Sequence, residues 1–237
     1  MVRRAPYLGA QGLASNAKPR IDAQMRSFVA LFLLLGTPCL SQSANDRCSA
    51  NEARVFDAIG MVAIGSAGDD NICTGALIAP DRVLTAAHCI VDQVTGDWVS
   101  ASDVTFFAGQ TEQGYATSRV AARLLANPAF EPSLWSDATE ANFKAMLHAV
   151  ASDLAVVELA RPIPKERIAP LPLANDAGFA GPVALFGYGD PESDALKPYP
   201  ACLLFYRETE SVSLSCRAEP GVSGAPMLGE HNGSWRI

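Results

Sequence analysis

Short apolar runs, broken by Gly, Pro, Asp and Asn, fill the chain from Cys48 to its end. Runs of four to eight residues that are rich in Val, Ile, Leu and Phe and bounded by turn residues predict β-strands. We predict strands at Ile59–Ile64, Cys73–Ala79, Arg82–Thr85, Val104–Ala108, Ser118–Leu125, Asp153–Leu159, Val183–Phe186, Ala201–Arg207, Ser211–Cys216, Ala225–Leu228 and Ser234–Ile237. Many short strands with regular turns predict an all-β fold of the sandwich or barrel type.

One segment departs from this β pattern. Asp137 and Glu140 form a plausible helix N-terminal cap pair, and apolar residues then follow at helical spacing: Phe143, Met146, Leu147 and Val150. The pattern predicts one short amphipathic helix near 137–150. We expect this helix to be a surface insertion that packs its own apolar face and has no functional role.

The first 43 residues resemble an export signal rather than part of the folded domain. Arg26 precedes an apolar run at 28–35, and small residues follow, which is the order of a secretory signal peptide. The run is too short to span a bilayer. We therefore predict a signal peptide at 25–43, an extra, disordered segment at 1–24 and a secreted or periplasmic protein with no membrane association after signal removal. Met25 is an alternative start.

The net charge excludes one class of partner. The whole chain carries a net charge of −7, and residues 1–43 hold five basic residues but only one acid, so the remaining domain is more acidic still. Such a domain is not expected to bind nucleic acid or acidic membranes through its charge.

Five cysteines remain after residue 43: Cys48, Cys73, Cys89, Cys202 and Cys216. Export makes disulfides plausible. No Cys-x-x-Cys or His-rich spacing is present, so we predict no metal site and no cofactor. The acidic pairs Asp69-Asp70 and Asp190 with Glu192 are more typical of solvated loops than of calcium sites.

Three segments offer the members of a catalytic triad: Thr-Ala-Ala-His-Cys at 85–89, Asp-Leu-Ala-Val-Val at 153–157 and Gly-Val-Ser-Gly-Ala-Pro at 221–226. A hydroxyl is a weak nucleophile at neutral pH and needs an imidazole as base and a carboxylate to orient that imidazole. The chain order His88, Asp153, Ser223 is that of the chymotrypsin-like double barrels.

Each of these residues also has a simpler interpretation. His88 could be a core histidine, Asp153 a cap at a strand start and Ser223 a turn residue, but all three together are much better explained by one triad. The other histidines are weaker candidates for the base. His148 falls on the predicted helix, and His231 falls in a Gly-rich hairpin turn.

On these segments the chain resembles the trypsin/chymotrypsin family of serine peptidases from about Arg54 to its end. The likeness includes Cys73 to Ile78 followed by Val83 to Cys89, the aspartate region from Asp153 with Arg161-Pro162 after it, and Phe186-Gly187-Tyr188-Gly189. The resemblance implies two antiparallel six-stranded β-barrels, about 55–165 and 170–237, with the active site in the cleft between them.

The resemblance also implies the role of each residue. Ser223 would attack a peptide carbonyl to give an acyl-enzyme, His88 would carry the proton, and Asp153 would hold His88. The N–H groups of Gly221 and Ser223 would form the oxyanion hole. The family places a disulfide beside its histidine, which here is Cys73–Cys89, and we expect Cys202 to pair with Cys216. Cys48 is then left free or has lost its partner.

Two features depart from the family pattern. Val222 stands where animal trypsins carry an Asp that pairs with the N-terminal ammonium after cleavage, so we expect no activation by cleavage at Arg54. Only fourteen residues follow Ser223. We therefore expect the second barrel to be incomplete, without the strand that walls the specificity pocket. Specificity stays open, although Arg217 would favour acidic side chains if it lined the pocket.

The sequence therefore predicts a monomeric, secreted serine endopeptidase that acts on polypeptides. The alternative is a protease-like binding module that is inactive or weakly active, because the pocket strand is missing. A structural β-barrel adhesin would explain none of the three motifs.

Overall fold

The computed structural model of the chain describes residues 55–65, 72–92, 94–109, 114–133, 143–174, 183–189, 195–202, 204–207, 212–214, 219–231 and 233–237. The predicted signal peptide at 25–43, the segment at 1–24 and Cys48 lie outside these residues, as do Asp69-Asp70, Asp190, Glu192, Cys216 and Arg217. None of the described helices combines the length and hydrophobicity needed to cross a membrane.

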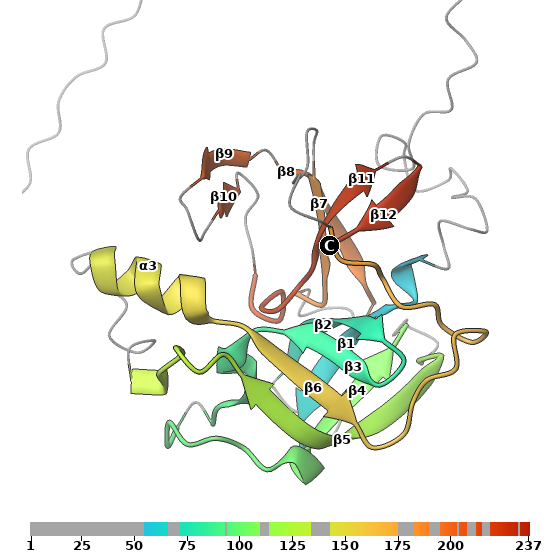
Figure 1. The fold of residues 1–237 in the computed structure, drawn as a ribbon, viewed down its shortest axis with the longest axis horizontal. Helices are drawn as coiled ribbons and strands as arrows, with labels where there is room; N and C mark the ends of the chain where they lie inside the picture. The colour runs from blue at the N-terminus through green and yellow to red at the C-terminus, as the bar shows by residue number, and fades with distance from the viewer. Residues whose placement is uncertain are drawn as a thin grey trace, which may run out of the picture. The chain divides into compact units, whose positions relative to one another are not determined.

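Six antiparallel strands form a closed barrel in the order β1-β2-β3-β6-β5-β4 (Figure 1). Their bounds are β1 Ile59–Ile64, β2 Ile72–Ala79, β3 Arg82–Thr85, β4 Val104–Ala108, β5 Thr117–Ala126 and β6 Ala155–Leu159. The predicted bounds are confirmed for β1, β3 and β4. β2 begins one residue earlier than predicted, and β5 is longer than predicted by one residue at each end. The all-β, barrel-type fold predicted from the sequence is therefore confirmed.

The barrel closes because alternate residues of its strands point into one core. On β6, Ala155, Val157 and Leu159 are buried while the residues between them are partly exposed. The ring of Phe106 fills the space beside Gly60, where a Cβ would lie only 2.4 Å from Phe106 Cε2. A side chain at Gly60 would therefore displace the core.

The second half of the chain forms open sheets within the described residues. A four-stranded sheet has the order β12-β11-β7-β8, and β9 pairs with β10 in a separate two-stranded sheet. The bounds are β7 Val183–Gly187, β8 Lys197–Cys202, β9 Leu204–Arg207, β10 Val212–Leu214, β11 Met227–His231 and β12 Ser234–Arg236.

The prediction of a single strand at Ala201–Arg207 is wrong. The structure has two strands there, and the first begins earlier, at Lys197. Pro198 and Pro200 hid this strand from the sequence pattern, because proline cannot donate to a ladder. β8 accommodates them since it is the edge strand of its sheet.

The predicted helix is present as α3, Phe143–Ser152. It runs two residues past the predicted end, and the predicted start at Asp137 lies outside the described residues. The N–H of Asp153 donates to the carbonyl of Val150, 3.3 Å away, so Asp153 follows the last helical turn. Strand β6 therefore begins at Ala155 and not at Asp153, which corrects the predicted strand start.

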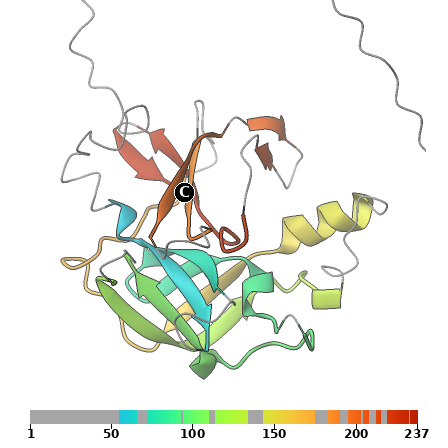
Figure 2. The same ribbon diagram turned by 180° about the vertical axis from the view of Figure 1, so that it is seen from behind.

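The two halves share one hydrophobic core. Phe56, just before β1, lies 4.5 Å from Phe186 of β7 and 6.4 Å from Trp235 of β12, measured between ring centroids. Leu228 of β11 is fully buried in the same cluster as the barrel residues. Figure 2 shows β7 and β11 beside the barrel from the opposite side. The shared packing holds loops of the second half against the barrel.

Candidate active site

Strand pairing brings His88 and Asp153 to the same edge of the barrel. β3 and β6 are antiparallel neighbours with Thr85 opposite Ala155. His88 lies three residues after Thr85, on the short 3-10 helix η2, Ala87–Ile90. Asp153 lies two residues before Ala155, after α3. Residues that are 65 positions apart along the chain therefore meet.

The carboxylate of Asp153 contacts His88 at two points. Oδ2 lies 2.6 Å from His88 Nδ1, and Oδ1 accepts the backbone N–H of His88 at 2.8 Å. The two side chains are only 15% and 9% exposed. A carboxylate accepts hydrogen bonds, so this contact favours the tautomer with the proton on Nδ1, in which Nε2 is the nitrogen that can accept a proton.

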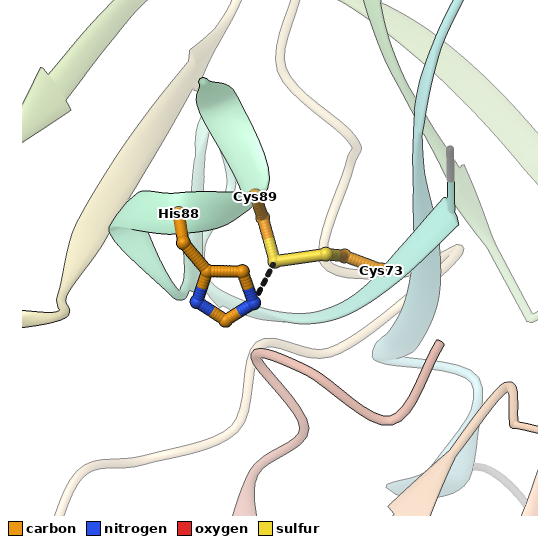
Figure 3. Close-up of side chains that lie close together, drawn as sticks. All are labelled: Cys73, His88 and Cys89. Atoms are coloured by element: carbon orange, nitrogen blue, oxygen red, sulfur yellow. Dashed lines mark hydrogen bonds between the residues drawn. A yellow bond between two sulfur atoms is a disulfide. The ribbon is translucent and has the colours of Figure 1, made fainter. Parts of the chain in front are cut away.

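A disulfide joins the histidine segment to β2. Cys73 and Cys89 are bonded, as expected from the family resemblance, and the Sγ of Cys89 lies 3.8 Å from His88 Nε2 (Figure 3). These three residues also form a cluster with metal-ligand chemistry. The disulfide uses both sulfurs, however, so neither is a thiolate ligand.

The loop that carries Ser223 packs against β2 and against the residues just before His88. The carbonyl of Ser223 accepts the N–H of Thr74 in β2 at 2.8 Å. The adjacent Gly224 has φ +77°, and a Cβ there would lie 2.2 Å from the Oγ1 of Thr85 and 2.9 Å from the N of Ala86. Only glycine allows this close approach. Ser223 itself is partly exposed.

Gly221 turns the same loop, with φ +92°. A Cβ there would lie 2.0 Å from the carbonyl oxygen of Tyr188, so this position also needs glycine. The N–H of Val222 donates to Glu219, and that of Ala225 donates to Val222. Among the residues that the structure describes, none accepts a hydrogen bond from the N–H of Gly221 or Ser223.

Val222 lies between Gly221 and Ser223 along the chain, and its side chain belongs to a buried apolar cluster. It is 4% exposed and packs with Val183 and Leu185 of β7. Burial, and to a lesser degree the charge of Glu219, raises the pKa of the neighbouring Tyr199. The surroundings of Val222 therefore favour an apolar side chain over a charged one.

The other sequence candidates lie elsewhere in the fold. His148 is exposed on α3, and His231 ends β11 at the hairpin to β12. Of the three histidines, His88 is the one that contacts Asp153. Sequence reasoning missed Thr74, whose side chain is fully buried beside the Ser223 loop. The feature of the sequence that could have pointed to Thr74 is a hydroxyl-bearing residue near the start of a largely apolar strand.

The family described as the trypsin-like peptidase domain matches residues 73–235, well over half of the chain. The chain belongs to this family. It is therefore a peptidase, and its family implies polypeptide substrates. No curated protein sequence matches this chain significantly.

Two solved structures share the fold. One is a thermostable serine protease, AL20, from an extremophilic microorganism, with 16% identity and a TM-score of 0.55 over 76% of this chain and 82% of that one. The other is a Glu endopeptidase in complex with MPD, with 16% identity and a TM-score of 0.54 over 77% of this chain and 85% of that one. At this identity the likeness concerns the fold of this trypsin-like peptidase alone.

Proposed function

We propose that this peptidase is a serine endopeptidase in which Ser223, His88 and Asp153 form the catalytic triad. The observation that carries the proposal is the 2.6 Å contact between Asp153 Oδ2 and His88 Nδ1, on an edge of the barrel against which the Ser223 loop is hydrogen-bonded. A carboxylate that holds an imidazole, with a serine close to that imidazole, activates the serine hydroxyl as a nucleophile.

The reaction begins when Ser223 Oγ attacks the carbonyl carbon of the scissile peptide bond. His88 Nε2 takes the hydroxyl proton, and the negatively charged Asp153 stabilises the imidazolium. The imidazolium then protonates the leaving amine, which leaves an ester between the substrate acyl group and Ser223. Water, deprotonated by His88, hydrolyses that ester and restores the hydroxyl.

The N–H groups of Gly221 and Ser223 stabilise the tetrahedral intermediate. Within the described part of the chain, no residue accepts a hydrogen bond from either group, which supports their assignment as donors. Two N–H groups fixed in advance toward the developing oxyanion typically contribute about 3 kcal/mol each to the transition state. The glycines on either side of Val222 and Ser223 give the backbone the positive φ angles that this loop needs.

Labelling with a fluorophosphonate probe tests the proposal. The probe should react with the wild type and not with Ser223→Ala, while the matched control Ser234→Ala, an exposed serine in β12, should label like the wild type. Cleavage of a peptide library should follow the same order. Equal labelling of the wild type and Ser223→Ala would refute the serine mechanism, and folded protein without any labelling would favour the binding module.

Export and a monomeric state belong to the same proposal. The Cys73–Cys89 disulfide is typical of an oxidising compartment, and the signal-like segment at 25–43 fits a secreted or periplasmic enzyme. N-terminal sequencing of the exported protein should give a start near residue 44. An intact N-terminus recovered from the cytoplasm would refute export, and a dimer by light scattering would refute the monomer.

A further inference from the structure

Thr74 is a fully buried threonine between the barrel and the Ser223 loop. Its main chain has a partner on each side. The N–H donates to the carbonyl of Ser223, and the carbonyl accepts the hydroxyl of Thr85, each at 2.8 Å. These two bonds place the Thr74 side chain between the histidine segment and the loop.

The hydroxyl of Thr74 bonds to two further segments. It donates to the carbonyl of Gly221 at 2.8 Å and accepts the N–H of Tyr188, which follows β7, at 3.0 Å. A hydroxyl is well suited to this position because it donates and accepts at one atom. Both bonds are buried, so loss of the hydroxyl would remove a hydrogen-bond partner from each backbone group where water does not readily replace it.

The peptide unit between Gly221 and Val222 is thus fixed at both ends. Thr74 Oγ1 bonds its carbonyl, and the carbonyl of Glu219 accepts its N–H at 3.1 Å. This unit lies in the chain between the N–H of Gly221 and the N–H of Ser223. Rotation of the unit would turn the two donors away from a common point.

We infer that Thr74 is a positioning residue that holds the oxyanion-binding donors of Gly221 and Ser223 in their productive orientation. The inference rests on the proposed function for its catalytic meaning. It adds to the site a residue of β2 that is fully buried and therefore does not contact the substrate. The hydroxyl, rather than the methyl group, carries this role.

Three variants test the inference. Thr74→Val keeps the shape and removes the hydroxyl, Thr74→Ser keeps the hydroxyl, and Thr117→Val removes another buried threonine hydroxyl, on β5, whose described partner is Arg119. An unsatisfied buried hydrogen-bonding group that matters in the transition state lowers a rate by about 10- to 100-fold. We expect such a loss in kcat/KM for Thr74→Val, mostly in kcat, and values within about threefold of the wild type for the other two.

Affinity for inhibitors separates positioning from a general structural role. A peptide boronate, which mimics the tetrahedral intermediate, should bind Thr74→Val more weakly by about the factor lost in kcat/KM. The same peptide with a methylene group in place of the scissile carbonyl, which offers no oxygen to these donors, should bind all variants alike. Equal loss of both affinities, or an equal activity loss in Thr74→Ser and Thr74→Val, would overturn the inference.

Hydrogen exchange provides a readout that does not need activity. The amide of Tyr188 should exchange slowly in the wild type, and the segment 219–226 should exchange faster in Thr74→Val but not in Thr74→Ser or Thr117→Val. Rapid exchange of the Tyr188 amide in the wild type would overturn the inference even if Thr74→Val does not fold. Slow exchange in a wild type that neither labels nor cleaves would instead refute the proposed function and leave Thr74 as the anchor of the loop.

Discussion

Asp153 holds His88 through both of its carboxylate oxygens. One accepts the backbone N–H of His88 at 2.8 Å, and the other lies 2.6 Å from its Nδ1. The first contact fixes the position of the 3-10 turn that carries His88, and the second fixes the tautomer of the ring. An amide in place of the carboxylate retains one acceptor but presents N–H₂ to Nδ1, which favours the opposite tautomer.

Asp153→Asn should therefore lower kcat strongly while the fold is kept. The expected loss is about 10⁴-fold, the magnitude this substitution has in serine peptidases of the triad type. The measurement is steady-state hydrolysis of a peptide substrate, with thermal unfolding followed in parallel. Asp81→Asn, an exposed residue in the β2–β3 turn, is the matched control. More than a tenth of the wild-type kcat in Asp153→Asn would contradict the assigned role.

Val222→Asp should destabilise the protein at neutral pH. The side chain is buried in an apolar cluster with Val183 and Leu185. An unpaired buried charge costs about 3–5 kcal/mol, whereas the truncation Val222→Ala should cost only about 2 kcal/mol. The free energy of unfolding in urea measures both. Equal stability of the wild type and Val222→Asp would mean that a cation pairs with the new carboxylate in this cluster.

The pH dependence of the same variant gives a second check. Burial raises the folded-state pKa of the introduced carboxyl, so the destabilisation should be smallest near pH 4 and grow as the pH rises. Since Val222 cannot pair with an ammonium group, cleavage after Arg54 should leave the hydrolysis rate within about twofold. A large rise in rate after that cleavage would point to N-terminal activation.

The barrel could be predicted from the sequence because its strands are short apolar runs bounded by turn residues. The predicted bounds of β1, β3 and β4 agree with the structure residue by residue for this reason, and β1 is buried along all but its last residue. β8 escaped prediction because Pro198 and Pro200 interrupt the pattern, and their tolerance depends on the edge position of that strand. The edge position is a property of the sheet order, which the local sequence does not contain.

The candidate site, like the fold, could be predicted only in part from the sequence. The motifs identified His88, Asp153 and Ser223 as candidates, but the closeness of His88 and Asp153 follows from the β3–β6 register. Thr74 could not be predicted from a motif. Its hydroxyl contacts Gly221 and Tyr188, which are 147 and 114 positions away along the chain. Such a role is visible only once the strands are paired in three dimensions.

Removal of the disulfide should cost stability and also disturb His88. Cys73 and Cys89 close a loop of 16 positions, and a link of this length contributes about 3 kcal/mol by restricting the unfolded chain. The double variant Cys73→Ser/Cys89→Ser should unfold at a correspondingly lower urea concentration and should have a lower kcat. The wild type with and without a reducing agent is the internal control. Unchanged stability in the double variant would contradict a structural role for the disulfide.

Glu158 should make the barrel more stable at neutral than at acid pH. It lies on β6 between two arginines: Arg123 of β5 donates to it from Nε at 2.9 Å and Nη2 at 2.8 Å, and Arg82 of β3 lies 3.7 Å away. The hydrogen bonds from Arg123, followed by the charges of both arginines, hold the pKa of Glu158 below its usual value. A lowered folded-state pKa stabilises the protein above the unfolded pKa, and this contribution is lost as the pH falls through the folded pKa.

Glu158→Gln should therefore unfold at a lower urea concentration than the wild type at pH 7. The two proteins should converge as the pH falls below the unfolded pKa of about 4.3 and through the lower folded pKa of Glu158. Because the pair is accessible to solvent, the difference at pH 7 should be small and should shrink further in 1 M salt. Glu166→Gln, an exposed residue in the turn after Pro164, is the control and should follow the wild type at both pH values. A difference between Glu158→Gln and the wild type that persists at pH 3 would assign the effect to packing of the side chain across β5, β6 and β3 instead of to its charge.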